Sequence, residues 1–319
     1  MSEATAQASG RTIVARGAIG AAAAILYVFI WATAFVPSRV LARDTPPLWI
    51  LTIRFGVAGG ILLLLAAALR LRIPRDADSW VRLFALGLGG NALYLGLNYL
   101  ALKHLSAGMG SIIASTNPLI LAVLAPWLLR EPLTARKVTG LVLGFGGVVL
   151  AMHARAGTQT ARLPDVLLAV SGVVAFVFSN ILYKRMRDRP HPLVLNGAQL
   201  LCASAAVCLG ALLLEGPPAI VWTPPVVWSL LYLIVILSVG ASMLWFWILQ
   251  HGEASRVSAY FFLTPAFGLL LAAALLGEQL TATDGIALLV IATGLWLVAH
   301  EPSRGLSAGR QGTLASRSS

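Results

Sequence analysis

The chain alternates between long, uncharged apolar stretches and short clusters of charged residues. Roughly 20 consecutive apolar residues span a bilayer as an α-helix, and ten stretches of about that length follow one another. In the first half they are Gly17–Pro37, Pro47–Leu69, Leu83–Leu102, Ser106–Leu129 and Thr134–Met152. In the second half they are Val166–Tyr183, His191–Leu214, Val226–Leu249, Val257–Gly277 and Ala282–Ala299. The pattern predicts an all-α polytopic membrane protein with ten transmembrane helices.

The two halves of the chain echo each other at an offset of 147 residues. The offset pairs Asn117-Pro118 with Thr264-Pro265, Glu131 with Glu278, and Thr134 with Thr281. Because each half holds five predicted helices, an odd number, the second copy enters the membrane from the opposite side. The sequence therefore predicts two inverted five-helix repeats, residues 17–153 and 164–300, around a central cavity.

The charge distribution predicts the orientation in the membrane. The chain is 58% hydrophobic and only 11% charged, yet its net charge is +11. Of its 23 Lys and Arg residues, 17 lie in the tails and loops predicted on the side of the N-terminus, and five lie on the other side. This positive-inside bias predicts that both termini lie in the cytoplasm. The two tails, 1–16 and 301–319, are expected to be disordered. The excess of Lys and Arg therefore reflects the orientation of the chain in the membrane and does not indicate nucleic-acid binding.

Local motifs predict how the repeats begin and bend. Pro118 and Pro265 lie inside predicted helices, where a proline removes a backbone donor and kinks the helix, so both are candidate hinges. Thr134 and Thr281 are placed to cap the helices that follow them, and Asp284 completes a capping-box pattern. For Glu131 and Glu278 two interpretations stand: a carboxylate that fixes a turn, or a gating salt bridge.

Gly140 and Gly144 predict a close helix contact, because small residues at a four-residue spacing let two helices approach. That contact lies either within the chain or at a dimer interface, so we expect a monomer or a weak dimer.

These features together resemble the EamA-type members of the drug/metabolite transporter superfamily. The residues that carry the resemblance are the N/T-P…E-x-L-T segments near the end of each half, Ile30-Trp31 and Arg54-Phe55. The resemblance covers nearly the whole chain. It implies a ten-helix inner-membrane carrier, often an exporter of amino acids or other small metabolites, with a cavity between its halves.

Polar residues within apolar spans locate the candidate site, because such residues usually face the bundle interior or a watery cavity. Asn91, Tyr94 and Asn98 share one helical face. Shifted by 147, the same positions are Ser238, Ala241 and Trp245, and Ser242 adds a hydroxyl beside them. Either the two stripes form opposite walls of one cavity, or they make interhelical hydrogen bonds that hold the bundle together.

Three further features add candidate substrate-binding residues. Tyr27 and Trp31 share a helical face, and Tyr260 lies in the ninth stretch. Arg54 is the only charge well inside a predicted span. Its guanidinium either snorkels to water, joins a structural ion pair, or receives a substrate carboxylate.

The positions of the acids restrict the function. All twelve Asp and Glu residues lie in tails, loops or span ends, whereas proton-driven export of cationic drugs normally needs a buried acid. We therefore predict an alternating-access exporter of neutral or zwitterionic amino acids, aromatic ones included, with broad specificity. The alternative is export or facilitated transport of other small metabolites or drugs. A membrane-embedded enzyme is disfavoured, because the histidines lie near span ends without a paired acid or metal spacing. No catalytic residue, metal or cofactor is predicted.

Overall fold

The computed structural model describes residues 22–128, 134–155, 162–186, 188–250 and 263–299. Within these ranges every regular element is helical and no strand occurs, so the all-α prediction is confirmed for this part of the chain. The elements are α2 (Phe35–Asp44), α3 (Pro47–Ala68), α4 (Ala77–Gly87), η1 (Leu88–Leu93), α5 (Tyr94–Leu102), α6 (Ala107–Ala114), α7 (Asn117–Leu128), α8 (Ala135–Arg155), α9 (Leu163–Arg185), α10 (Pro192–Leu214), α11 (Pro224–Tyr232), η3 (Leu233–Ala241), α12 (Ser242–Gln250), α14 (Thr264–Leu276) and α15 (Ala282–Ala299).

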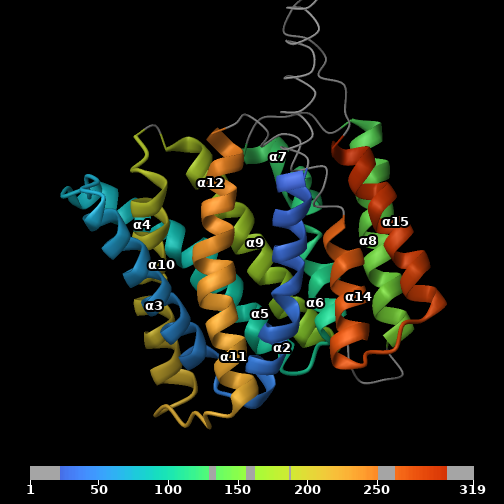
Figure 1. Ribbon diagram of the computed structural model, residues 1–319. Coiled ribbons are helices and arrows are strands. Elements are labelled where there is room, and N and C mark those ends of the chain that lie inside the picture. Colours follow the sequence, from blue (N-terminus) through green and yellow to red (C-terminus); the bar gives the residue numbers. More distant parts are fainter. Residues whose placement is uncertain (1–21, 129–133, 156–161, 187, 251–262, 300–319) are drawn as a thin grey trace, which may run out of the picture.

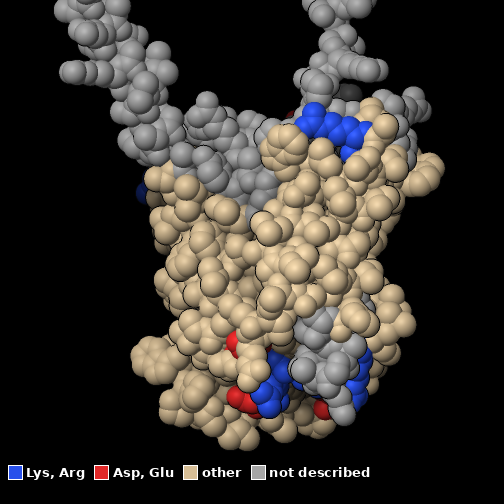
Figure 2. Space-filling view, turned by 90° about the vertical axis from the view of Figure 1, so that its right-hand side faces the viewer, with Lys and Arg blue, Asp and Glu red and all other residues tan. Residues whose placement is uncertain are grey.

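The helices have the length and composition of membrane spans. Six continuous helices are long and apolar enough to cross a bilayer: Ala22–Asp44, Pro47–Ala68, Ala77–Leu102, Leu163–Tyr183, Pro192–Leu214 and Pro224–Leu244. Shorter apolar helices occur at Ala107–Leu121, Thr264–Leu276 and Ala282–Leu297. Figure 2 shows charged side chains at the two ends of the molecule, separated by a broad uncharged belt. Large apolar side chains such as Leu64 and Leu213 are exposed on the outside, as a lipid-facing surface requires.

The predicted end of the first helix was wrong. The first helix does not end at Pro37: after a turn at Ala34 it continues as α2 to Asp44. Pro37 lies in the first turn of α2, where the missing N–H of a proline does little harm.

The stretch Ser106–Leu129 is broken rather than kinked. α6 ends at Ala114 and α7 begins at Asn117, so Pro118 stands in the first turn of a new helix. Pro265 likewise occupies the first turn of α14. The hinge role of the two prolines stays a prediction.

Two π-helical segments occupy matching places in the two halves. η1 lies between α4 and α5, and η3 lies between α11 and α12. The offset of 147 carries residues 88–93 onto 235–240, inside η3. A π-segment holds an extra residue in its turn and redirects the helix face, often at a functional site.

α8 and α15 cross at glycines whose contacts are reciprocal. A Cβ added to Gly147 would lie 3.0 Å from the carbonyl oxygen of Ala287, and one added to Gly294 would lie 2.6 Å from that of Gly140. Positions 140 and 147 correspond to 287 and 294 at the 147 offset. The contact of Gly147 with residue 287 is therefore equivalent to the contact of Gly294 with residue 140. Because early positions of α8 meet late positions of α15, the two helices are antiparallel. Gly140 and Gly144 thus serve a contact within the chain.

Four other helix pairs are also strongly packed. α3 packs on α10, α5 on α9, α6 on α14 and α2 on α11. The α3–α10 contact is also a glycine contact, since a Cβ on Gly59 would lie 2.9 Å from the carbonyl oxygen of Gly197. Figure 1 shows α3 and α10 along one side of the bundle and α8 and α15 along the other.

Side-chain caps fix the starts of several helices. Asp284 accepts the backbone N–H of Thr281 at 2.9 Å, and the hydroxyl oxygen of Thr281 accepts the backbone N–H of Asp284 at 3.2 Å. This capping box and the cap from Thr134 to the backbone N–H of Lys137 (3.3 Å) confirm the sequence predictions. Asp76 caps α4 through Ser79, and these hydrogen bonds hold the pKa of its carboxyl below the usual value.

Candidate functional site

Arg54 lies inside the bundle and is surrounded by neutral groups. It is the eighth residue of α3, and only 7% of its surface is exposed. Its Nε donates to Ser238 Oγ at 3.2 Å, and its Nη1 donates to Tyr99 OH at 3.3 Å. The Phe55 ring centroid lies 5.8 Å from the guanidinium carbon. Burial excludes the snorkelling interpretation for this conformation, and no carboxylate of the described residues forms an ion pair with Arg54.

Hydrogen bonds continue from Arg54 in both directions. On one side, Tyr99 OH lies 2.9 Å from Ser38 Oγ in α2. On the other side, the backbone oxygen of Ser238 accepts from Asn196 Nδ2 at 3.4 Å and from Ser242 Oγ at 2.7 Å. We call this set the interhalf network; its members are Ser38, Arg54, Tyr99, Asn196, Gln199, Ser238 and Ser242.

The members of the interhalf network that belong to the second half also form hydrogen bonds with one another. Asn196 Nδ2 also donates to Ser242 Oγ at 2.7 Å, and Gln199 Nε2 donates to Asn196 Oδ1 at 2.8 Å. Asn196 therefore binds a carbonyl within η3, where the π-segment alters the backbone hydrogen bonding. The Arg54–Ser238 bond is the link that joins the first-half members to the second-half members.

The predicted stripe on the third helix faces another direction. Asn98 Nδ2 donates to the carbonyl oxygens of Tyr94 (2.7 Å) and of Ala169 in α9 (3.5 Å). The Tyr94 ring stacks on Phe176, also in α9, with centroids 4.6 Å apart. In this conformation Asn98 and Tyr94 make interhelical contacts with α9, as the packing interpretation expects, and their hydrogen-bond and ring contacts do not include Ser238 or Ser242.

The remaining candidates are distributed as follows. Tyr27 and Trp31 stack with centroids 6.4 Å apart; Tyr27 is buried and Trp31 is half-buried. Asn91 is half-buried within η1. Trp245 lies in α12, but its side chain is outside the described part, as is that of Pro118, and Tyr260 falls wholly outside it.

Sequence reasoning overlooked Ser38 and Tyr99. Tyr99 follows Asn98 directly and so points about 100° away around the helix, toward α2 and α3 instead of α9. A tyrosine in an apolar span gives no signal by itself. The one available clue was that Arg54, a charge in a span, must have polar neighbours.

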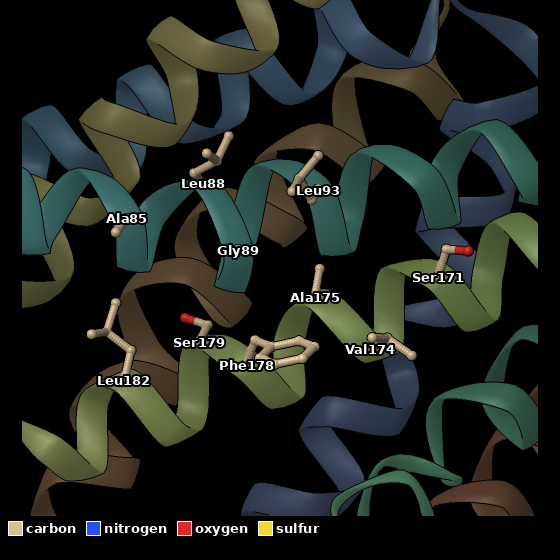
Figure 3. A pocket seen from close by; sticks show the side chains of 10 residues that line it. All are labelled: Ala85, Leu88, Gly89, Leu93, Ser171, Val174, Ala175, Phe178, Ser179 and Leu182. Atoms are coloured by element: carbon tan, nitrogen blue, oxygen red, sulfur yellow. The ribbon is translucent and has the colours of Figure 1, made fainter. Parts of the chain in front are cut away.

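An apolar groove lies apart from the interhalf network. It has a volume of about 430 Å³ and runs between α4–η1 and α9 (Figure 3). Its polar side chains are Ser171 and Ser179, and the Ser179 hydroxyl donates to the Leu86 carbonyl at 3.1 Å. None of the predicted site residues lines this groove, and none of its lining residues is charged.

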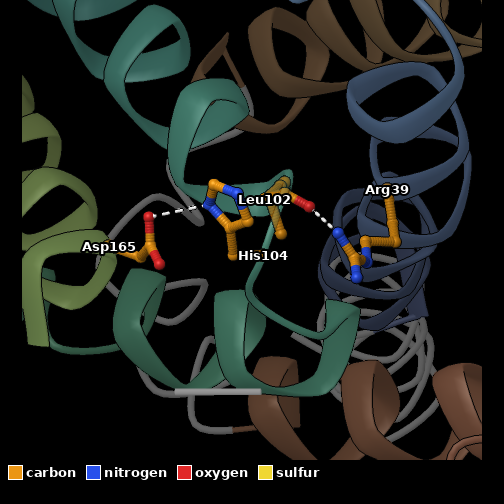
Figure 4. A network of polar contacts seen from close by, with 4 residues as sticks. All are labelled: Arg39, Leu102, His104 and Asp165. Atoms are coloured by element: carbon orange, nitrogen blue, oxygen red, sulfur yellow. Dashed lines mark hydrogen bonds and ion pairs between the residues drawn. The ribbon is translucent and has the colours of Figure 1, made fainter. Parts of the chain in front are cut away.

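Polar contacts, some within the first half and some between the halves, also gather at one end of the molecule. His104 Nδ1 lies 3.1 Å from Asp165 Oδ1, and Arg39 donates to the Leu102 carbonyl (Figure 4). Nearby, Glu278 accepts the backbone N–H groups of Ala107 and Gly108 at 2.8 and 3.3 Å. This contact is neither the turn-fixing contact nor the gating salt bridge considered for Glu278. Instead, its carboxylate caps the start of α6. Glu131 lies outside the described residues.

A third carboxylate of the second half makes the same kind of contact. Glu215 accepts the backbone N–H groups of Leu48 and Trp49, at the start of α3, at 3.1 and 3.2 Å. Within the described ranges, no three His, Cys, Asp or Glu side chains are close enough to hold a metal ion.

A bundle of apolar helices with an uncharged belt and a buried polar cluster defines a multi-pass α-helical membrane protein. Comparison with known proteins then identifies the family. The EamA-like transporter family matches residues 18–152 and again residues 163–299. The chain belongs to this family and is a membrane transporter.

Individual relatives have similar lengths. An uncharacterized transporter of Bacillus subtilis, YvbV, is 30% identical over 271 residues, covering 85% of this chain and 88% of the relative. Probable amino-acid metabolite efflux pumps of Salmonella typhimurium and Escherichia coli are 27% and 23% identical; each alignment covers 86% of this chain and 92% of the pump. A solved crystal structure, 18% identical, has a TM-score of 0.63 and is covered to 97%, so it shares the fold.

Proposed function

We propose that this transporter exports small metabolites, amino acids above all, across the bacterial inner membrane by alternating access. The expected substrates are neutral or zwitterionic, aromatic amino acids included, and the specificity is broad. Two inverted five-helix repeats, residues 17–153 and 164–300, rock around a central cavity, and both termini lie in the cytoplasm.

Two structural observations support the inverted repeat. The glycine contacts between α8 and α15 are reciprocal and antiparallel, as a twofold axis between two inverted copies requires. The π-segments η1 and η3 also fall at corresponding positions. Such symmetry is useful in a transporter, because exchanging the conformations of the two copies converts an inward-open state into an outward-open one.

The observation that carries the proposal is the buried interhalf network. Arg54, Ser238 and Ser242 belong to it, and we propose them as substrate-binding residues together with Tyr27, Trp31, Asn91, Trp245 and Tyr260. For Tyr94 and Asn98, which contact α9, we propose the packing role instead. Hydrogen-bonding groups without a fixed acid suit a solute that carries both an amino group and a carboxylate. The names of the Salmonella and Escherichia relatives, amino-acid metabolite efflux pumps, point to the same substrates.

The acids of the described residues disfavour cationic drugs as the main substrates. Each of them lies in a loop or close to the end of its helix: Asp44, Asp76, Asp78, Asp165, Asp188, Glu215, Glu278 and Asp284. A hydrophobic cation entering the bundle would therefore meet Arg54 and no carboxylate of this set.

Counterflow in proteoliposomes tests the proposal. The purified full chain is reconstituted, loaded with one unlabelled amino acid, and exposed to the same labelled amino acid outside. We expect transient accumulation of several neutral amino acids and none in protein-free vesicles. If correctly inserted protein accumulates none of a broad amino-acid panel, the amino-acid proposal fails; accumulation of a drug or another metabolite would then favour the alternative substrates.

A further inference from the structure

We infer that Arg54 is the receptor for a carboxylate of the transported solute, so that every good substrate is a small carboxylic acid. This inference rests on the proposed function and narrows it. It makes the anionic group the common feature of the substrates, and it assigns the amino group and the side chain to a less selective part of the site.

The first argument is the unbalanced charge. Removing a charged guanidinium from water is energetically costly unless an anion balances the charge. Arg54 is 7% exposed, and its partners in the described part of the chain are two hydroxyl groups and an aromatic ring. Hydroxyls stabilise the cation through their dipoles, but they do not neutralise it. A carboxylate entering from solution would do so.

The second argument is the unused hydrogen-bonding capacity. A guanidinium has five N–H donors in a planar fork that matches a carboxylate. Ser238 and Tyr99 take two of these donors, at 3.2 and 3.3 Å, which are long for charge-assisted bonds. No acceptor among the described residues takes the other three. A bidentate carboxylate supplies two strong acceptors, and its bonds would be shorter.

The third argument is the position of Arg54 between the halves. Its bond to Ser238 crosses from α3 to η3, and Ser238 in turn is held by Asn196 and Ser242. A carboxylate that replaces Ser238 on the guanidinium would alter the contact that joins the two parts of the interhalf network. Substrate binding and rearrangement of the halves would thus act on the same bond, as alternating access requires.

Paired compounds test this inference in the wild-type protein. Three unlabelled compounds are compared as inhibitors of the counterflow of labelled phenylalanine: phenylalanine, its methyl ester and phenethylamine. The ester masks the carboxylate, and phenethylamine lacks it. We expect phenylalanine to compete at least tenfold better than the other two, a difference of about 1.4 kcal/mol or more. Equal competition by all three would overturn the inference.

Substitution of Arg54 provides the second arm. Arg54→Gln removes the charge, and Arg54→Lys keeps it without the planar fork. We expect the preference for the acid to disappear in Arg54→Gln and to be partly retained in Arg54→Lys. The matched control is Ser204→Ala, which removes another α3–α10 hydrogen bond, that of Ser204 Oγ to the Thr52 carbonyl at 2.8 Å, and should keep the wild-type preference. An unchanged preference in Arg54→Gln would contradict the assignment.

A binding measurement covers the case in which a variant does not fold or nothing is transported. Phenylalanine, but not phenethylamine, should raise the melting temperature of the wild-type protein in detergent. The same measurement in phosphatidylcholine vesicles, with and without phosphatidylglycerol, separates a solute carboxylate from a lipid phosphate. Stabilisation that needs the anionic lipid and not the acid would overturn the inference.

The failure of this inference can be told apart from the failure of the proposed function. Equal counterflow of acids and amines would refute only this inference. Binding of acids without any counterflow would refute the proposed function instead.

Discussion

Glu278 Oε1 accepts the backbone N–H of Ala107 at 2.8 Å, although the two residues are 171 positions apart. The same carboxylate accepts from Gly108, so one acid of the second half caps a helix of the first half. A carboxylate at a helix N-terminus satisfies unpaired donors and complements the helix dipole.

We expect Glu278→Gln to destabilise the protein by about 1 kcal/mol, because the amide offers one acceptor oxygen and no charge to two backbone donors. Thermal unfolding in detergent measures the effect. Asp78→Asn, at an exposed site in the first turn of α4, is the control and should change the melting temperature less. Equal effects would mean that the cap is not a significant source of stability.

Substitution of Gly294 should weaken the contact between α8 and α15. A Cβ at this position would lie 2.5 Å from the backbone nitrogen of Gly144, and backbone cannot move aside as a flexible side chain can. We expect Gly294→Ala to cost about 1–3 kcal/mol. Gly147→Ala should have a similar effect, because its contact is the reciprocal one.

The control for these glycine variants lies on the same helices. A Cβ at Gly146 or Gly285 meets no atom within 4 Å, so Gly146→Ala and Gly285→Ala should leave the melting temperature unchanged or raise it through better helix propensity. If all four variants behaved alike, the reciprocal contact would not be tight in the membrane.

Asn98→Ala should act on stability more than on transport. Asn98 is buried and bonds a carbonyl of α9, so its loss removes an interhelical hydrogen bond worth about 1 kcal/mol. We expect a lower melting temperature and a near-normal counterflow rate for each folded molecule. A rate that falls tenfold at unchanged stability would place Asn98 at the substrate after all.

The orientation in the membrane is tested by cysteine labelling. In a chain whose Cys202 and Cys208 are replaced by alanine, a cysteine is placed at either of two exposed positions, His104 or Arg75. With both termini in the cytoplasm, an impermeant maleimide should label His104→Cys in intact spheroplasts and Arg75→Cys only after lysis. The reverse pattern would show that the positive-inside prediction is wrong.

Much of the fold was predictable because its signals are local. A long uncharged apolar stretch, a Thr-x-x-Asp cap and a small-residue spacing each act within a few residues of sequence. The apolar helices, the caps of α8 and α15 and the use of Gly140 within the chain therefore agree with the structure. The end of the first helix was misplaced at Pro37; this proline lies in the first turn of α2, where a proline does not stop a helix.

The site was less predictable, because a helical side chain has a direction that spacing alone does not specify. Asn91, Tyr94 and Asn98 share a face, but the packing of α5 decides that Tyr94 and Asn98 turn toward α9. Arg54 was recognisable as unusual, but its neighbours were not, since Ser238 and Tyr99 come from helices 184 and 45 positions away.

The sequence by itself determined that this is a duplicated, apolar, helical chain of the EamA-like family, because hydropathy and repeat signals are written in the order of residues. Only the tertiary structure decided which groups surround Arg54 and which acids of one half cap helices of the other. Those contacts depend on how the helices rotate and cross when they pack. They matter energetically because a buried polar or charged group cannot be solvated by water. An arginine left among hydroxyls in the interior therefore becomes the most specific chemical feature of the transporter.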